Sequence, residues 1–450
     1  MNYEQLLKKY EPMCELVEYW ESKSNKEIIV QQNKELKSYI KADSSGFSAR
    51  MLVNGCFGFA SSSNLAKKEE VFKTAFKLAK NASLIKKNKT IIKDFEFHKA
   101  KIKSEIKIDP FNIDESEKIN FLKDFNNSFS LKELKNSETT ISFSKNNQIY
   151  ANSKFAEILQ GSNYSQIFSD ITAGNENVHN IRRAKKGYEL FNFNYNEFVK
   201  ESEDKIKRLM NSRLANPGRY NIVIDPEISG TFFHEAVGHA LEADCVREKS
   251  TCIGLGEQVS TEELTLYDNP TLKDYWGSYS YDAEGIKSKQ NMLINKGKIV
   301  NFMNDLSSYF DVNGLKKTSN ARMQSVHNMP IPRMSNTEVK SGKYSKQELI
   351  EQIKNGLLVK GFSGGAVEPI TGVFSFKADE AFLIKNGKIA NSFKGASLSG
   401  DLKQVLKNIT GISNEFGSPY SGGMCGKKGQ SVPVSEKVPY IAVRDINVGN

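Results

Sequence analysis

Two histidines and a glutamate lie close together in the stretch FFHEAVGHALEAD, residues 232–244. His234 and His239 offer imidazole nitrogens, which are common zinc ligands, and Glu235 offers a carboxylate that can act as a general base. The stretch is one residue longer than the H-E-x-x-H pattern, in which two histidines on one helix face hold zinc beside such a base. Because the whole chain has only 5 histidines, this clustering favours a metal site over two histidines that merely pack in a buried helix.

The spacing of these histidines constrains the helix that carries them. Each residue of an α-helix turns by about 100°, so side chains five positions apart point about 140° away from each other. A single π-type turn, which has roughly 4.4 residues, would realign them, and such turns occur mostly at functional sites. Gly238, directly before His239, tolerates a distorted backbone. We therefore predict a bulge or local unwinding between His234 and His239.

A catalytic zinc site takes three protein ligands and leaves a further position for water, whose pKa the metal lowers to about 7. The candidates for the third ligand are Glu242, Asp244 and Cys245 near the helix, and His327 and Cys425 further along the chain. Cys425 stands in the glycine-rich stretch SGGMCGKKGQ, where its neighbours supply no apolar bulk for core packing. From the residues alone it is a ligand, a nucleophile or an incidental thiol. Glu242 and Asp244 are alternatively groups that orient a ligand.

The first half of the chain must supply a scaffold of helices and antiparallel strands. Apolar and polar residues alternate over 26–43 and 47–62, with Asn54-Gly55 as a turn, and again over 139–173. Amphipathic or capped patterns predict four helices, at 3–20 with a possible kink at Pro12, at 63–82, near 114–126 and at 195–214. Asn216-Pro217-Gly218 then interrupts the pattern, so we predict an N-terminal α/β domain over 1–216.

The second half, 217–450, is richer in glycine and short strands and is the predicted metal-binding domain. A strand at 219–225 leads into the motif helix, and a loop-rich stretch covers 246–290. Two strand-turn-strand units, 291–303 and 380–394, share a similar turn, and 327–339 is extended because its prolines exclude a helix. The predicted fold class is α+β with two domains, an antiparallel sheet with helices followed by a mainly antiparallel β domain that carries the metal-binding helix.

The composition argues against several other classes of protein. The 63 basic and 53 acidic residues give a net charge of +10, but the lysines are mixed with glutamates along the chain. This favours a solvated lysine-rich surface over a nucleic-acid site, and the longest basic stretch, 84–95, carries no nucleic-acid-binding motif. The 5 scattered cysteines favour a reducing cytoplasm over a disulfide framework. We expect neither a signal peptide nor a membrane span.

The metal motif and several other segments together resemble the TldD/PmbA family of metalloproteases. The segments are FFHEAVGHALEAD, ARMLVNGCFGFASSSNLAKKEE (49–70), IYANSKFAEI (149–158), IPRMSNTEV (331–339), GGAVEPITGVFSFKADEAFLIKNGKI (364–389), KGASLSG (394–400) and MCGKKGQSVPV (424–434). They follow the family's order and cover nearly the whole chain. One departure lies in the middle segment, where the family typically has N-S-E-G or N-S-D-G and this chain has Lys154 and Phe155 after Asn152-Ser153.

The resemblance implies a function for the motif. Because the histidine motif is present, the chain resembles the active, TldD-like subunit and not the paralogous partner that lacks the motif. This implies a Zn²⁺ site of His234, His239 and Cys425, with Glu235 as general base. It also implies cleavage of peptides and unstructured protein segments, and a dimer, either a homodimer or a heterodimer with a motif-lacking PmbA/TldE-like paralogue.

An extended peptide substrate suggests candidates for binding residues. Gly364 and Gly365 are predicted to form a strand edge that a substrate backbone can approach and pair with. Arg333 and Asn336 are polar groups in an extended segment that could hold a substrate carbonyl or carboxylate, or only pin a loop. Two other functions remain open, a metal-dependent amidase and a non-enzymatic zinc-containing protein that modulates a DNA enzyme.

Overall fold

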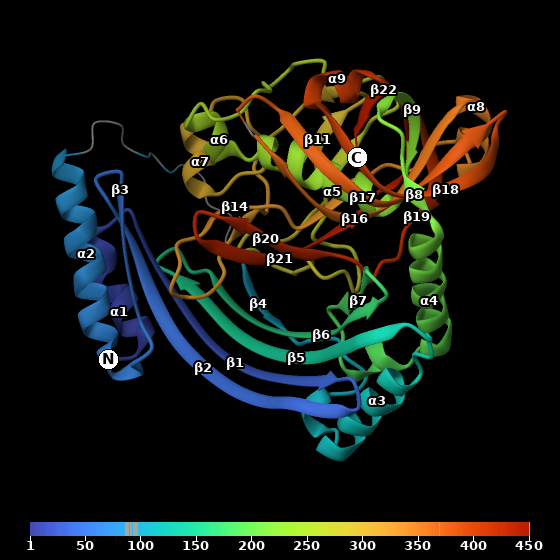
Figure 1. Cartoon of the computed structure of the whole chain (residues 1–450). Coiled ribbons are helices and arrows are strands. Elements are labelled where there is room, and N and C mark those ends of the chain that lie inside the picture. Colours follow the sequence, from blue (N-terminus) through green and yellow to red (C-terminus); the bar gives the residue numbers. More distant parts are fainter. Residues whose placement is uncertain (86–89, 91, 93–97, 369, 450) are drawn as a thin grey trace.

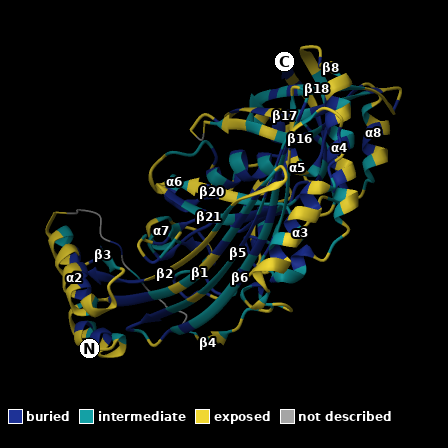
Figure 2. Cartoon of the chain, turned by 60° about the horizontal axis from the view of Figure 1, so that its bottom comes forward, coloured by how far each residue is buried: buried dark blue, intermediate teal, exposed yellow. Residues whose placement is uncertain are grey.

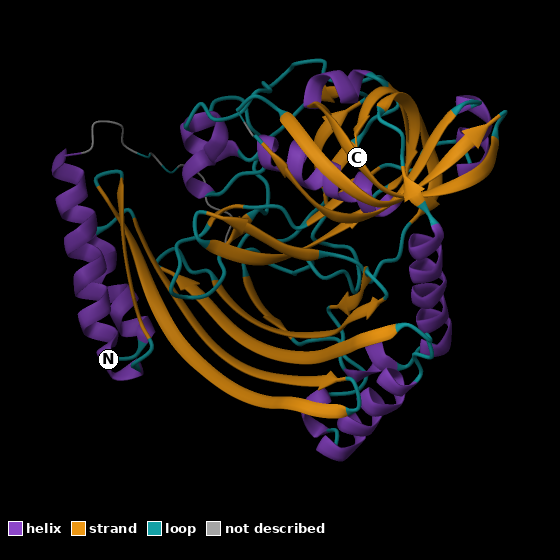
Figure 3. Cartoon of the chain, viewed as in Figure 1, coloured by secondary structure: helices purple, strands orange, loops and turns teal. Residues whose placement is uncertain are grey.

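A computed structural model describes residues 1–85, 90, 92, 98–368 and 370–449. Figure 3 shows an α+β molecule in which a long curved sheet lies beneath a second body of sheets and short helices. This confirms the predicted fold class. Most of the basic stretch at 84–95 lies outside the described residues.

The first sheet has the strand order β3-β2-β1-β5-β6-β4, with β7 paired to β6. Its strands are β1 (Leu16–Gln32), β2 (Glu35–Val53), β3 (Cys56–Ser62), β4 (Lys99–Ile102), β5 (Leu134–Asn152), β6 (Glu157–Ala173) and β7 (Glu176–Ala184). The predicted turn at Asn54-Gly55 joins β2 to β3, and both residues have positive φ (47° and 73°), as a tight hairpin turn requires.

Helices cover both ends of the outer face of this sheet (Figure 1). They are α1 (Tyr3–Tyr10) and α2 (Lys68–Ile85) at one end and α3 (Glu115–Asn127) near the other, with α4 (Tyr195–Asn211) leading toward the second half. The prediction of a helix over 3–20 is wrong beyond Met13, because β1 begins at Leu16. Residues 16–20 are all buried, and four of the five are apolar, so the run lacks strand alternation and periodicity cannot distinguish it from a helix.

The second half contains a seven-stranded sheet, β19-β22-β9-β16-β17-β18-β8, and a six-stranded sheet, β12-β11-β10-β15-β21-β20, beside the pair β13-β14. The larger sheet comprises β8 (Arg213–Leu214), β9 (Gly218–Ile224), β16 (Gly356–Val367), β17 (Val373–Lys385), β18 (Lys388–Asp401), β19 (Ile409–Phe416) and β22 (Pro439–Gly449). The smaller sheet and the pair comprise β10 (Leu266–Asp268), β11 (Asn291–Asn295), β12 (Lys298–Ile299), β13 (Ala321–Arg322), β14 (Ile331–Pro332), β15 (Asn336–Val339), β20 (Gly423–Lys427) and β21 (Gln430–Lys437).

The helices of this half are short. They are α5 (Pro226–Phe232), α6 (Ala243–Arg247), α7 (Leu306–Asp311), α8 (Lys346–Ile353) and α9 (Leu402–Lys407). Both predicted hairpins, β11-β12 and β17-β18, are present, and the stretch 246–290 is mostly loop. None of the helices in the described ranges is long and apolar enough to cross a membrane.

The two halves pack against each other through buried contacts. Arg50 on β2 reaches Glu284 in the second half, with 2.6 Å between Nη2 and Oε1, and Trp20 on β1 donates to the Ala283 carbonyl at 2.6 Å. At the other end, α4 is tied to β17 by the Lys205–Asp379 ion pair. Figure 2 shows the strands of the first sheet buried where they meet the second half. The boundary between 216 and 217 stays a prediction, since β8 precedes it and pairs with β18 of the second half.

Candidate metal centre

The motif helix is buried because it lies across the larger sheet. Asp225 caps α5 by accepting from the Ile228 N–H, and Pro226 occupies the first turn, where its missing N–H costs nothing. Phe232 at the end of α5 packs edge-on against Phe374 and Phe376 of β17. This packing fixes the helix on the sheet and determines which way the following histidines point.

A π turn, Phe233–Gly238, follows α5 directly, and a 3₁₀ turn, His239–Leu241, follows the π turn. The predicted bulge between the two histidines is therefore confirmed. The two imidazole rings lie near each other, with 5.5 Å between centroids and 86° between planes. Glycine at position 238 lets the turn pack against Met334, because an added Cβ would lie 2.1 Å from Met334 Sδ.

Cys425 on β20 completes the cluster. Its Sγ lies 3.2 Å from His239 Nε2, and one donor atom each of His234, His239 and Cys425 lies within 4.8 Å of the others. Both ring nitrogens of His234 are buried without a hydrogen-bond partner in the described part of the chain. A buried polar group normally has a partner, and two imidazoles with a thiolate are a donor set that suits zinc. The residues present therefore fit a zinc ion.

The charges around Cys425 favour the form of the side chain that binds metals. Burial alone would raise the pKa of the thiol, but its interactions with His234 and His239 outweigh burial and lower the pKa to about 5. Burial opposes a charged His239, yet the carboxylate of Glu242 and the Cys425 sulfur raise the pKa of this imidazole well above its usual value. The cluster thus holds a thiolate at neutral pH, and the thiolate is the form that ligates metals.

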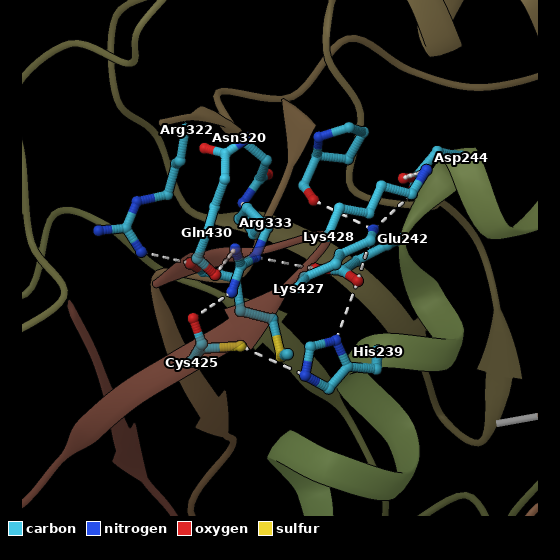
Figure 4. Close-up of polar contacts among 12 residues, drawn as sticks. His239, Glu242, Asp244, Asn320, Arg322, Arg333, Cys425, Lys427, Lys428 and Gln430 are labelled. Carbon is cyan, nitrogen blue, oxygen red and sulfur yellow. Dashed lines mark hydrogen bonds and ion pairs between the residues drawn. The ribbon is translucent and has the colours of Figure 1, made fainter. Parts of the chain in front are cut away.

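Glu242 contacts the His239 ring at the nitrogen that does not face Cys425, as Figure 4 shows. His239 Nδ1 donates to Glu242 Oε2 at 3.0 Å, which leaves Nε2 facing Cys425. Lys427 Nζ donates to the same Glu242 oxygen at 2.9 Å and to Asp244 at 2.6 Å. Burial would raise the pKa of Glu242, but His239 and Lys427 lower it to about 2. Glu242 therefore holds the His239 ring in place, and its own charge is already compensated by Lys427.

The other candidates for a third ligand are placed differently. Glu242, Asp244 and Cys245 do form a second group of possible ligands, but the Lys427 ammonium pairs with its two carboxylates. His327 lies beside Gly46 of β2, where an added Cβ would lie 2.7 Å from its Nε2. Glu242 thus meets the cluster only at His239 Nδ1, the nitrogen that does not face Cys425. Asp244, Cys245 and His327 do not belong to the group of His234, His239 and Cys425.

Glu235 faces the cluster from its solvent side. Its side chain is 45% exposed, and its Oε2 lies 3.9 Å from His239 Nε2, the nitrogen that faces Cys425. This position suits a base that acts on a water molecule next to the ligand atoms.

Two neighbours of the cluster were missed in the sequence. Lys427 stands two residues after Cys425 in β20, so strand alternation could have placed both side chains on one face. Glu436 on β21 has Oε1 3.5 Å from His234 Nδ1. Burial raises the pKa of Glu436, against the opposing effect of His234. No signal in the sequence pointed to Glu436.

Arg333 and Asn336 are fully buried and are bonded within the protein. Arg333 donates to the Cys425 carbonyl and, at 3.3 Å, to the Gln430 carbonyl, so it holds the β20-β21 hairpin in place. Asn336 donates to the Asn269 carbonyl at 2.7 Å and to Ser278 Oγ at 2.8 Å. With 0% exposure for both, neither is placed to touch a substrate, and the alternative that they pin a loop is favoured.

Gly364 and Gly365 lie in the outer part of β16, where they pair with Lys377 and Phe376 of β17. On its other side β16 pairs with β9 only at Leu357–Val359. Within the described residues, the second edge of the glycine segment therefore has no strand partner. Strand β16 as a whole also contacts the π turn.

Comparisons with known proteins identify a family and several relatives. Residues 217–450 match the family model described as the PmbA/TldA metallopeptidase C-terminal domain. A metalloprotease of Methanocaldococcus jannaschii is 31% identical over 441 residues, covering 96% of this chain and 97% of that protein. A zinc metalloprotease TldD homolog of Saccharolobus solfataricus is 32% identical over 275 residues, covering 60% of this chain and 61% of that protein. The chain spans 55% of the length of a metalloprotease of Methanothermobacter thermautotrophicus, to which it is 41% identical over 255 residues.

Solved structures share the fold at low sequence identity. A candidate modulator of a DNA gyrase from Thermotoga maritima superposes with a TM-score of 0.81 at 17% identity, covering 99% of both chains. TldE from Thermococcus kodakarensis superposes with a TM-score of 0.75 at 18% identity, covering 100% of both chains.

Proposed function

The chain belongs to the PmbA/TldD family of metallopeptidases, and on this basis we propose that it is a zinc-dependent peptidase that hydrolyses peptides and unstructured protein segments. The observation that carries the proposal is the convergence of His234, His239 and Cys425 within 4.8 Å, with the carboxylate of Glu235 beside them. When bound there, zinc would supply Lewis-acid polarisation of the scissile carbonyl and would acidify water.

The chain's own residues perform the remaining tasks. His234, His239 and Cys425 hold the ion, and Glu242 keeps the His239 ring oriented through its Nδ1. Glu235 accepts the proton of the attacking water and returns it to the leaving amine. The exposure of Glu235, at 45%, lets this proton transfer occur at the solvent side, where a substrate enters.

The open edge of β16 at Gly364 and Gly365 is the proposed binding site for the substrate backbone. A strand edge pairs with any extended peptide through main-chain hydrogen bonds. It therefore suits unfolded segments of varied sequence and excludes folded proteins, whose strands are already paired. The proposal includes a cytoplasmic dimer, formed with a second copy or with a motif-lacking paralogue.

The test compares wild type with Cys425→Ala and Glu235→Gln, using zinc content per chain and cleavage of casein, an unfolded protein. We expect about one zinc in wild type, a large loss in Cys425→Ala, and full zinc with at least about 100-fold slower cleavage in Glu235→Gln. Undiminished zinc in Cys425→Ala would remove this residue from the ligand set. If wild type holds zinc but cleaves only small amides, the amidase is favoured. If wild type holds zinc and hydrolyses neither small amides nor casein, the non-enzymatic protein is favoured.

A further inference from the structure

A cavity of about 740 Å³ lies on the first sheet, between β1, β5, β6 and the segment that follows β4. It opens on the outer face. Tyr19 of β1 lies on the outer face, because it packs against Phe72 of α2. Glu21, two residues further along the same strand, lies on the same face. Its neighbours across the sheet are Ile149 of β5 and then Leu159 of β6. These last three residues line the cavity. Figure 2 brings this face forward, with α2 at one end and α3 near the other. The metal centre belongs to the second half, which packs on the inner face.

The segment over residues 103–109 lines the cavity beside the sheet, and at Gly161 the two lie at van der Waals distance, since an added Cβ would lie 3.5 Å from the Ser104 nitrogen. The segment is anchored by hydrogen bonds and an ion pair. The Lys107 and Ile108 N–H groups donate to the Glu189 carboxylate at 3.2 and 3.0 Å. At Asp109, Lys145 of β5 donates to the carboxylate at 2.6 Å. The cavity is therefore a built space between a strand face and an anchored segment.

Positive charge dominates the walls. Five lysines line the cavity against two acidic residues, Glu21 and Asp109. Asp109 neutralises Lys145, and Glu21 is already paired with Lys68 of α2 at 2.9 Å. Among the described residues, Lys23, Lys101, Lys103 and Lys107 form no ion pair. Four cations thus line a space that holds only two carboxylates, each of which is already paired with another lysine.

Asn163 adds an unused hydrogen-bond donor. It lines the cavity and is 2% exposed, and its Nδ2 has no hydrogen-bond partner in the described ranges. A buried donor without a partner costs free energy, and an acceptor in the cavity would relieve that cost. Half-buried Ile106, Ile149 and Leu159 supply apolar surface beside it.

We propose that this cavity binds a small organic anion, with an apolar body against the isoleucine and leucine side chains and a phosphate or carboxylate group between the lysines and Asn163. The volume suits a small-molecule ligand, whose pockets span roughly 300–1,000 Å³. The proposal does not depend on the metal centre or on peptidase activity.

The probes for this proposal share one aromatic ring and differ in charge. Phenyl phosphate and isophthalate test phosphate and carboxylate sources of the anion, and phenol is the neutral control. Isothermal titration calorimetry on the full chain should show binding of at least one anion that weakens with added salt, because screening reduces the attraction between charges. Phenol should bind more weakly than either anion. Phenol binding equally well, or no binding of either anion, would overturn the proposal.

Variants then locate the site. Lys23→Gln and Lys103→Gln should each weaken binding of the preferred anion by up to about fivefold, the upper range for an exposed ion pair. Lys26→Gln is the matched control, because Lys26 is an exposed lysine of the same strand that does not line the cavity. An equal loss in the control would show general attraction to a basic surface and would overturn the site.

Asn163→Leu tests the unused donor with two readouts. It should weaken the anion and leave the melting temperature of the free protein equal or higher, because the variant removes an unpaired buried donor. A donor with a merely structural role would give the opposite result, lower stability with unchanged binding. If this variant does not fold, the lysine variants still decide the proposal.

Discussion

At the scale of single residues, the orientation of His239 is the feature that distinguishes a prepared metal site from a chance cluster. Glu242 is fully buried and accepts from His239 Nδ1, while Lys427 compensates its charge. A carboxylate behind a ligating histidine fixes the ring and raises its basicity, and its loss typically costs about 10- to 100-fold in metal affinity. The same strand supplies Cys425 and Lys427, so the proposed third ligand and the charge that compensates Glu242 are positioned by one element.

Glu242→Gln should therefore lower zinc affinity by about 10- to 100-fold without changing the ligand set. Competition against a chelator of known affinity measures the change. Lys428→Gln is the matched control, because Lys428 pairs with Asp244 and Glu248 but not with Glu242. Equal affinity in wild type and Glu242→Gln would mean that the ring is held by packing alone.

At the scale of elements, the π turn and the β20-β21 hairpin must meet for the cluster to form. The π turn inserts one residue into the helix and brings two histidines five apart to the same side. The hairpin is held by the buried guanidinium of Arg333, which donates to carbonyls on both of its strands. Met334, next to Arg333, fills the space beside Gly238, so one extended segment supports both elements.

Gly238→Ala should destabilise the protein by about 1–3 kcal/mol, the usual cost of forcing extra volume into a packed core. Its Cβ would lie 2.1 Å from Met334 Sδ, so the loss should shrink in a Met334→Ala background. Thermal unfolding of the two single variants and the double variant measures this coupling. Gly423→Ala is the control, because its added Cβ meets nothing within 4 Å. Additive losses would refute the contact as the cause.

At the scale of the whole molecule, a buried charge cluster joins the two halves. Arg50 binds Glu18 of its own sheet and Glu284 of the second half, and all three side chains are at most 1% exposed. Glu284 also accepts from the Leu306 N–H at 2.7 Å. Burial raises the pKa of Glu284 to about 8; Arg50 opposes this rise, and the nearby carboxylates of Asp305 and Glu18 add to it.

This pKa gives the stability a defined pH dependence. When folding raises the pKa of a carboxyl group, the folded state holds the proton more tightly than the unfolded state. The stabilisation is complete at pH values below the pKa in the unfolded state, and it is lost as the pH rises to the pKa in the folded state. Thermal stability of wild type should therefore fall between about pH 5 and pH 8, with each unit of raised pKa corresponding to about 1.4 kcal/mol. Glu284→Gln should flatten this slope.

Melting temperatures across that pH range measure the effect, and Glu248→Gln is the control, because Glu248 forms only exposed ion pairs, with Lys428 and Arg247. If stability instead rises with pH in wild type and the rise disappears in Glu284→Gln, the ion pair with Arg50 dominates and the stated direction is wrong.

The sequence alone was sufficient for the features that depend on local spacing. The five-residue separation of His234 and His239 predicted a bulge or local unwinding, since no regular helix points both side chains the same way. Asn54-Gly55 predicted the β2-β3 hairpin, because few residue pairs adopt the positive φ angles of that turn. The sequence also carried the resemblance to the family. These features depend on neighbouring residues, whose geometry the backbone itself limits.

Only the tertiary structure determined which distant groups meet. Cys425 lies 186 residues beyond His239, and residue type alone left it one of several candidates for the third ligand. Arg333 and Asn336 looked suited to a substrate, but packing buries both, because the hairpin and loops around them need their donors. The sequence likewise could not place Glu436 or the lysine-lined cavity, since burial and charge at such sites arise where strands far apart in sequence come together.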